Sequence, residues 1–64
     1  MNQTLAERIY EVIASKGEPM PLPDIQQAIE DKPISSIRGR IYDNLGKLFK
    51  KIARGVYWIG LRGH

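Results

Sequence analysis

Apolar residues near the start of the chain recur at helical spacing and predict a helix at residues 5–16. They share one face of that helix: Leu5, Ile9, Val12 and Ile13. Thr4 and Glu7 match a capping box, in which each side chain accepts a hydrogen bond from the other residue's backbone amide. Gly17 then permits the left-handed conformation that commonly ends a helix.

A proline-rich segment comes next and predicts an extended link followed by a short helix. Three prolines at residues 18–23 remove amide donors and fix the backbone, so this segment cannot be helix interior. Met20 and Leu22 alternate with the prolines, which fits an edge segment that pairs weakly with a hairpin. Pro23 suits the first position of a helix that we expect at residues 23–30, with a buried face of Ile25, Ala28 and Ile29.

A longer apolar stripe predicts a helix at residues 35–45. Its members recur at spacings of four, four and three residues: Ile37, Ile41, Leu45 and Leu48. Ser35 or Ser36 is the expected N-cap, and Gly46 fits the end of the helix. Because a proline-containing turn at residues 31–33 joins this helix to the preceding one, the pair matches a helix-turn-helix.

The last third of the chain predicts a β-hairpin. Residues 48–52 and 56–59 are rich in β-branched and aromatic side chains, which favour strands. Arg54 and Gly55 supply the turn, since Gly accepts a positive φ at little cost.

Two registers of this hairpin are consistent with the sequence. A two-residue loop pairs Ile52 with Tyr57, and a three-residue loop pairs Ile52 with Val56. We favour the first register, because it directs Ile52, Tyr57 and Ile59 toward the core. Trp58 then points outward.

These elements predict a small α+β fold, a winged helix-turn-helix of three helices and a C-terminal β-hairpin wing. The 64 residues suffice for a single domain, which we place at residues 1–60, with residues 61–64 as a flexible tail. Cys is absent, so no disulfide supplements the core. The expected core consists of Leu5, Ile9, Val12, Ile13, Ile25, Ile29, Ile37, Ile41, Leu45, Ile52, Tyr57 and Ile59.

Charge is distributed unevenly along the chain, although the net charge is only +3. Residues 1–37 contain three basic and six acidic residues, whereas residues 38–64 contain seven basic residues and one acidic residue. A positive field on one half of a small domain favours a polyanionic partner, and we expect double-stranded DNA. A surface that serves only solubility is the alternative interpretation.

Several classes of protein are disfavoured by what the sequence lacks. No apolar run reaches the ~18 residues of a transmembrane helix, and no signal-peptide pattern opens the chain, so we expect a cytoplasmic protein without membrane contact. The single His is the last residue, the carboxylates are scattered, and no glycine-rich phosphate loop occurs. We therefore expect no enzyme, no catalytic residue, no metal site and no cofactor.

Taken in order, these elements resemble winged helix-turn-helix domains over nearly the full length of the chain. The C-terminal motif Phe49-x-x-Ile52-x-Arg54-Gly55-x-Tyr57 looks most like the HARE-HTH modules of bacterial restriction, methylation and transcription proteins. The resemblance implies that the helix at residues 35–45 enters the major groove and that residues 53–55 form the wing. It also implies a role in transcription regulation or restriction-modification in bacteria.

Long cationic side chains in the second half of the chain are the expected phosphate ligands: Lys47, Lys50, Lys51 and Arg54, with Arg38 and Arg40 along the rim of the helix. Ser35 and Ser36, together with free amides at the helix N-terminus, offer a second phosphate site, although ordinary capping is equally consistent. Tyr42, Arg38 and Asn44 are the candidates for reading bases.

Three further residues have more than one interpretation. Gly39 permits either close approach of DNA or close packing against the preceding helix. Asp43 lies on the same helix face and would repel phosphate. Trp58 either packs within the hairpin or offers a stacking surface.

A second function stays open, namely a protein-interaction winged helix that uses an aromatic surface around Trp58, Tyr42 and Leu61. Salt separates the two functions, because phosphate contacts weaken steeply as salt rises and an apolar interface does not. The chain also fits a targeting module of a larger protein, such as a methyltransferase or nuclease. The sequence leaves open whether it acts as a monomer or a dimer.

Overall fold

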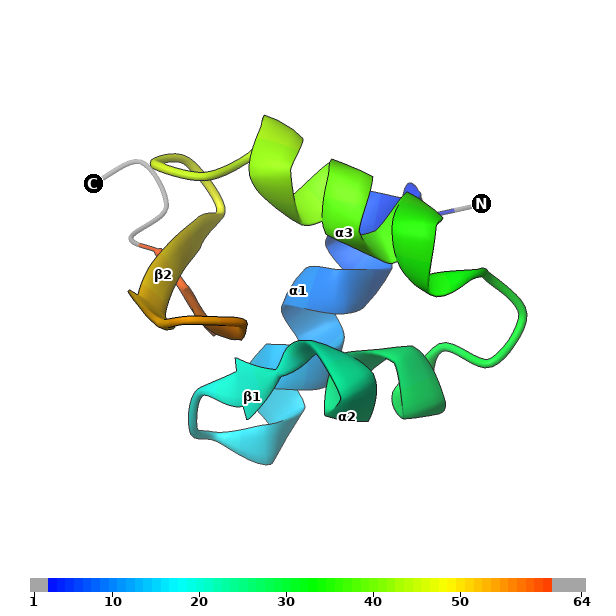
Figure 1. Cartoon of the computed structure of the whole chain (residues 1–64), viewed down its shortest axis with the longest axis horizontal. Coiled ribbons are helices and arrows are strands. Elements are labelled where there is room, and N and C mark those ends of the chain that lie inside the picture. Colours follow the sequence, from blue (N-terminus) through cyan, green and yellow to red (C-terminus); the bar gives the residue numbers. More distant parts are fainter. Residues whose placement is uncertain (1–2, 61–64) are drawn as a thin grey trace.

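The computed structural model describes residues 3–60, which form three helices and three strands (Figure 1). In chain order these are α1 (Leu5–Lys16), β1 (Met20–Pro21), α2 (Leu22–Ala28), α3 (Ile34–Asp43), β2 (Phe49–Ala53) and β3 (Val56–Ile59). The strands form one antiparallel sheet in the order β1-β3-β2. The expected α+β class is confirmed, whereas the tail predicted at residues 61–64 lies outside the described part.

Helix α1 has the bounds that the sequence predicts, because both of its ends are set by local interactions. The Glu7 amide donates to Thr4 Oγ1 at 3.1 Å, and the Thr4 amide donates to Glu7 Oε1 at 3.0 Å. Gly17 adopts a left-handed conformation with φ of 78°, and its amide donates to the Ile13 carbonyl at 3.0 Å. The predicted capping box and glycine stop are therefore confirmed.

Helix α2 begins and ends earlier than predicted. Extended Pro21 is its N-cap, so Pro23 takes the second helical position rather than the first. The helix ends at Ala28, and Ile29 leaves the helical conformation with φ of −115° and ψ of 79°. Ile29 is buried through this turn and Ala28 is exposed, so the prediction that Ala28 lies on the buried face is wrong.

Helix α3 begins at Ile34 and not at a serine cap. Pro33 is the N-cap, because its extended backbone has the conformation that a cap requires, and no side chain caps the helix. Its carbonyl accepts from the amide of Ser36 at 3.1 Å. Ser35 and Ser36 consequently lie in the first turn, and the prediction of either as N-cap is wrong.

The other end of α3 also comes earlier than predicted, at Asp43 instead of Leu45. Asn44 is the C-cap, and its side-chain amide donates to the Arg40 carbonyl at 2.8 Å. Gly46 has the positive φ expected of it, 82°, but it serves the turn after the helix.

The hairpin contains a β-bulge at Ile52, which neither predicted register includes. Lys51 pairs with Tyr57 and Ala53 with Val56, so Ile52 is the extra residue of β2. Its side chain is 50% exposed, and its predicted place in the core is wrong. Phe49 occupies the core instead and is fully buried. The turn at Arg54-Gly55 is confirmed, with φ of 70° at Gly55.

The extended segment after α1 holds the hairpin, as its sequence predicts. Met20 pairs with Tyr57 in antiparallel register. The amide of Leu22, the first residue of α2, donates to the Gly55 carbonyl in the hairpin turn at 2.9 Å. The tip of the hairpin is therefore fixed to the start of α2.

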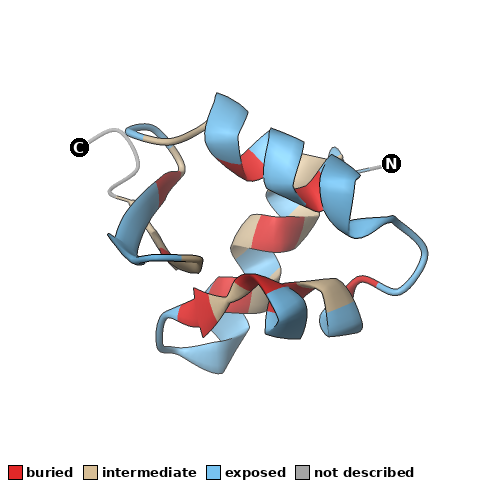
Figure 2. Cartoon of the chain, in the orientation of Figure 1, coloured by how far each residue is buried: buried red, intermediate tan, exposed pale blue. Residues whose placement is uncertain are grey.

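The core lies among the three helices and the inner face of the sheet (Figure 2). In the view of Figure 1, α1 lies between α2 and α3, and the hairpin lies opposite the α2–α3 turn. Four expected core residues only line its edge (Leu5, Val12, Leu45 and Ile59), and the buried set is Ile9, Ile13, Met20, Leu22, Ile25, Ile29, Ile37, Ile41, Phe49 and Tyr57. Within residues 3–60 no polar or charged residue is buried.

Candidate nucleic-acid interface

The outer surface of α3 is open to solvent along its whole length. Ile37 and Ile41 are fully buried and fix the inner side of the helix against the core. Figure 2 shows most of α3 in the colour of exposed residues. The exposed residues of the helix that follow Ile34 are Ser35, Ser36, Arg38, Gly39, Arg40, Tyr42 and Asp43. A helix held on one side and free on the other is the form that can enter a groove of a duplex.

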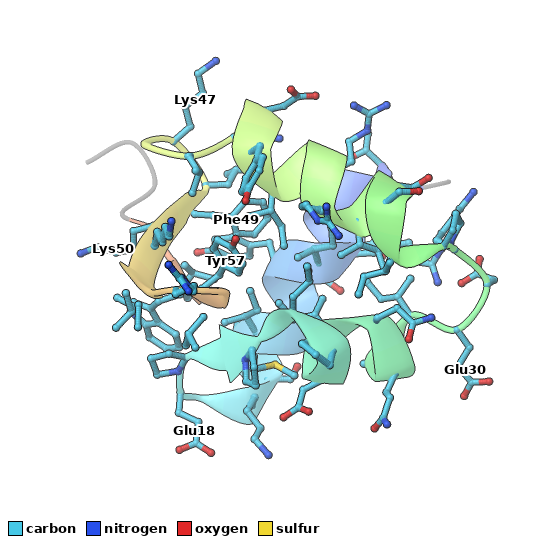
Figure 3. All side chains as sticks on the ribbon, viewed as in Figure 1. Glu18, Glu30, Lys47, Phe49, Lys50 and Tyr57 are labelled. Atoms are coloured by element: carbon cyan, nitrogen blue, oxygen red, sulfur yellow. The ribbon has the colours of Figure 1, made fainter. Side chains whose placement is uncertain are left out.

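The expected site residues of α3 lie on two different flanks. One flank faces the hairpin, where the rings of Tyr42 and Tyr57 meet edge to face at a centroid distance of 6.4 Å. Burial raises the pKa of the Tyr57 phenol, hydrogen bonding with Tyr42 raises it further, and the positive charge of Arg38 opposes this rise. Tyr42 therefore contacts Tyr57, which Figure 3 shows between the hairpin and α3, and Arg38 lies one turn before Tyr42 on the same flank of the helix.

The hairpin lysines lie on opposite faces of the sheet. Residues that pair across antiparallel strands point to the same face. Lys51 pairs with Tyr57 and so shares the face that packs toward the helices, at the exposed edge of the sheet. Lys50 pairs with Trp58 on the other face, and Figure 3 shows it pointing away from the helices. Only Lys51 extends the hairpin-facing flank of α3.

The two remaining hairpin-region cations occupy separate places. Lys47 lies in the turn after α3 and projects outward in Figure 3, beyond the C-terminal end of that helix. Arg54 is exposed in the β2–β3 turn, whose Gly55 carbonyl is held by the Leu22 amide. The structure thus places the four predicted hairpin-region cations at four separate locations rather than in one row.

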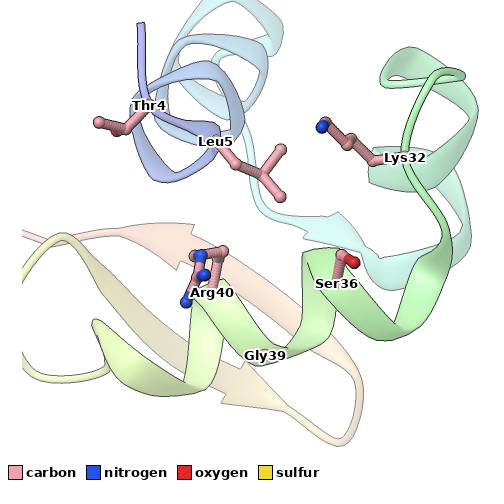
Figure 4. A pocket seen from close by; sticks show the side chains of 6 residues that line it. All are labelled: Thr4, Leu5, Lys32, Ser36, Gly39 and Arg40. Carbon is pink, nitrogen blue, oxygen red and sulfur yellow. The ribbon is translucent and has the colours of Figure 1, made fainter.

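The second flank of α3 faces the start of α1 and carries Ser36 and Arg40. Arg40 donates to Asp43 in an ion pair of 2.9 Å within the helix. Together with Thr4, Leu5 and Lys32, these two side chains line a hollow beside Gly39 (Figure 4). Sequence reasoning missed Lys32, because its position in a turn gives no sign that it approaches α1.

Two alternatives from the sequence are resolved by geometry. A Cβ atom built on Gly39 meets no atom of a neighbouring element within 4 Å. Close packing against α2 is therefore not the reason for a glycine at this position. Asn44, one of the candidates for base reading, donates its side-chain amide to the Arg40 carbonyl at the end of α3. Its side chain is thereby used in ending the helix.

The predicted phosphate site at the N-terminus of α3 is weaker than expected. The amides of Ser36 and Ile37 donate to the Pro33 carbonyl at 3.1 and 3.2 Å, so they are not free for a ligand. The Ser35 and Ser36 side chains are exposed and make no capping bond with α3. A phosphate at this end of α3 could therefore bind to the serine hydroxyls but not to the amides of Ser36 and Ile37.

Acidic side chains gather on the other side of the domain. Figure 3 shows Glu18 and Glu30 on the α1–α2 side, opposite Lys47. Arg8 pairs with one of the acidic residues, Asp31, to which it donates two hydrogen bonds of 2.8 and 3.0 Å. These bonds lower the pKa of the Asp31 carboxyl to about 2. The separation of charge is partial, because Glu7 and Glu11 line a hollow with Leu48 and Asp43 lies on α3.

Searches for similar proteins found no matching protein family, no matching curated protein and no matching solved structure. In the described part of the chain, no three metal-binding side chains lie close enough to hold an ion. No helix there is long and apolar enough to cross a membrane.

Proposed function

We propose that this chain is a winged helix-turn-helix domain that binds double-stranded DNA. Helix α3 would enter the major groove, and the β2–β3 hairpin would lie along the phosphate backbone. The element order α1-β1-α2-α3-β2-β3 and the sheet order β1-β3-β2 are compatible with such a domain. Within a cell it would act as a transcriptional regulator or as the targeting module of a larger DNA-processing protein.

One observation carries the proposal: the free face of α3 and the helix-facing edge of the hairpin meet in a single basic and aromatic surface. Tyr42 on α3 contacts Tyr57, Lys51 on β2 pairs with Tyr57, and Arg38 lies one helical turn before Tyr42. Arg38, Tyr42 and Lys51 are all exposed. Guanidinium and ammonium groups bind phosphate, and Tyr and Arg also contact bases. Glu18 and Glu30 lie on the side away from Lys47, and the acidic residue on α3, Asp43, is paired with Arg40. Such a charge distribution would favour approach of a polyanion to the hairpin side.

The protein-interaction alternative relies on an aromatic surface that the structure divides. Successive residues of a strand point to opposite faces, so Trp58 and Tyr57 lie on different faces of the hairpin. Tyr42 contacts Tyr57 and therefore lies on the face opposite Trp58. Trp58 itself packs partly against the core, and Leu61 lies outside the described residues.

Titration of the folded domain with unrelated duplexes tests the proposal. At about 50 mM salt, amide shifts should concentrate in α3 and β2 and spare the acidic side around Glu18. The affinity should fall steeply as salt rises, because each phosphate contact contributes ~0.9 to the log–log slope. Absence of shifts at low salt, or an affinity that salt does not change, would overturn DNA binding in favour of a protein partner.

A further inference from the structure

A hollow lies between α1 and α3 on the second flank of α3 (Figure 4). It has a volume of about 660 Å³ and is open to solvent. Its lining comes from the start of α1, the α2–α3 turn and the middle of α3: Thr4, Leu5, Lys32, Ser36, Gly39 and Arg40. Three segments that are distant in sequence thus converge on one site.

The lining of this hollow provides donors for an anion. Lys32 extends from its turn toward the start of α1, and Arg40 supplies a second positive charge from α3. Ser36 adds a hydroxyl. Thr4 Oγ1 accepts from the Glu7 amide at 3.1 Å, which leaves its proton available to a ligand. No carboxylate is among the lining residues in the described structure, although Asp43 accepts from Arg40 at 2.9 Å and Glu7 Oε1 accepts from the Thr4 amide at 3.0 Å.

Gly39 is an independent sign that something approaches this side of α3. Glycine inside a helix is unfavourable relative to alanine, because it loses more conformational freedom on folding. No neighbour requires a glycine here, since an added Cβ atom meets nothing within 4 Å. Because Gly39 has no side chain, it leaves space at the edge of the hollow through which a ligand can reach the cationic side chains.

We propose that the hollow binds a phosphodiester group of the duplex strand that passes the α1 side of α3. This inference rests on the proposed function and adds a second strand contact to it. A helix in the major groove has a sugar-phosphate strand on each side. The flank with Arg38 and Lys51 would hold one strand, and Lys32 and Arg40 would hold the other.

The ion pair between Arg40 and Asp43 modulates this site. Both side chains are more than half exposed, at 55% and 65%, and exposed ion pairs contribute little to stability. The guanidinium also has N–H donors beyond the one that contacts Asp43. Arg40 can therefore turn to a phosphate, and Asp43 acts as a competitor for it.

The site is tested by measuring duplex binding of variants that each lose one positive charge, with Lys16→Gln as the matched control. Lys16 is an exposed lysine at the end of α1, away from the hollow. Lys32→Gln and Arg40→Gln should each weaken binding about threefold to tenfold and lower the salt slope by ~0.9. Lys16→Gln should change affinity less than about twofold, since it removes only a distant charge. Asp43→Asn should strengthen binding.

The outcomes separate this inference from the function on which it rests. If the unmodified domain binds duplexes and Lys51→Gln weakens binding, but Lys32→Gln and Arg40→Gln behave like Lys16→Gln, the hollow is not a phosphate site and DNA binding stands. If the unmodified domain binds no duplex, both proposals fail. All of these residues are exposed, so the variants should keep the fold, which amide spectra will verify.

Discussion

At the scale of single residues, the pair of Arg8 and Asp31 connects two parts of this domain. Its two parallel hydrogen bonds connect α1 to the turn between α2 and α3, across 23 positions of sequence. Both side chains are substantially exposed, at 35% and 60%, so solvent screens their attraction. The pair therefore fixes a geometry more than it adds stability. That geometry positions the turn from which Lys32 reaches the hollow.

The pKa of Asp31 gives this pair a pH signature. Hydrogen bonding from Arg8 lowers the pKa to about 2 from 3.8. A carboxyl with a lowered folded-state pKa stabilises the fold above its unfolded pKa and loses that contribution as pH falls through the folded value. Above about pH 4, the unfolding temperature of the unmodified protein should thus be slightly higher than that of Asp31→Asn, and the difference should vanish below about pH 2. A difference that persists at the lowest pH would contradict the assignment.

At the same scale, sequence identifies which side chains are exposed better than it identifies what they touch. The nine predicted contact residues are all exposed, because charged and hydroxyl side chains rarely enter a core. Their grouping follows from tertiary packing, which local patterns do not contain. Lys50 and Lys51 are adjacent in sequence yet lie on opposite faces of a strand, and Lys32 joins Arg40 only through the fold.

At the scale of elements, prediction succeeds where the signals are local. Helix α1 has both a capping box and a glycine stop, so its bounds follow from the sequence. Helix α3 was misplaced at both ends, because extended Pro33 replaces a serine cap and Asn44 ends the helix before Gly46. The bulge in β2 depends on which side chain fills the core. That choice is made by packing, here of Phe49 against Tyr10 at a ring distance of 6.5 Å.

The bulge leads to a paired prediction for β2. The side chain of Phe49 is fully buried in the core, whereas Ile52 is 50% exposed. Phe49→Ala should cost about 3–5 kcal/mol in free energy of unfolding, and Ile52→Ala should stay within about 1 kcal/mol. Urea denaturation of the two variants measures both values. A larger loss for Ile52→Ala than for Phe49→Ala would restore the bulge-free register and refute the one described.

At the scale of the whole molecule, the fold keeps part of the charge division along the sequence, with Glu18 and Glu30 on the side opposite Lys47. The acidic first part supplies α1 and α2, and the basic second part supplies most of α3 and the hairpin. Because β1 pairs with β3 and Leu22 bonds to Gly55, the hairpin is held at a fixed place beside α3. Under the proposed function, the basic surface would need little rearrangement to bind a duplex, and little conformational freedom would be lost on binding.

The two adjacent lysines of β2 report how a duplex would lie on this molecule. Lys51 shares the face of Tyr57 beside α3, and Lys50 shares the outer face of Trp58, so the pair differs in direction but not in charge or element. If α3 is in the groove, Lys51→Gln should weaken duplex binding on all sequences alike and lower the salt slope by ~0.9, while Lys50→Gln should do clearly less. Fluorescence anisotropy over a salt series measures both effects. The reverse order would place the duplex on the outer face of the sheet and remove α3 from the interface.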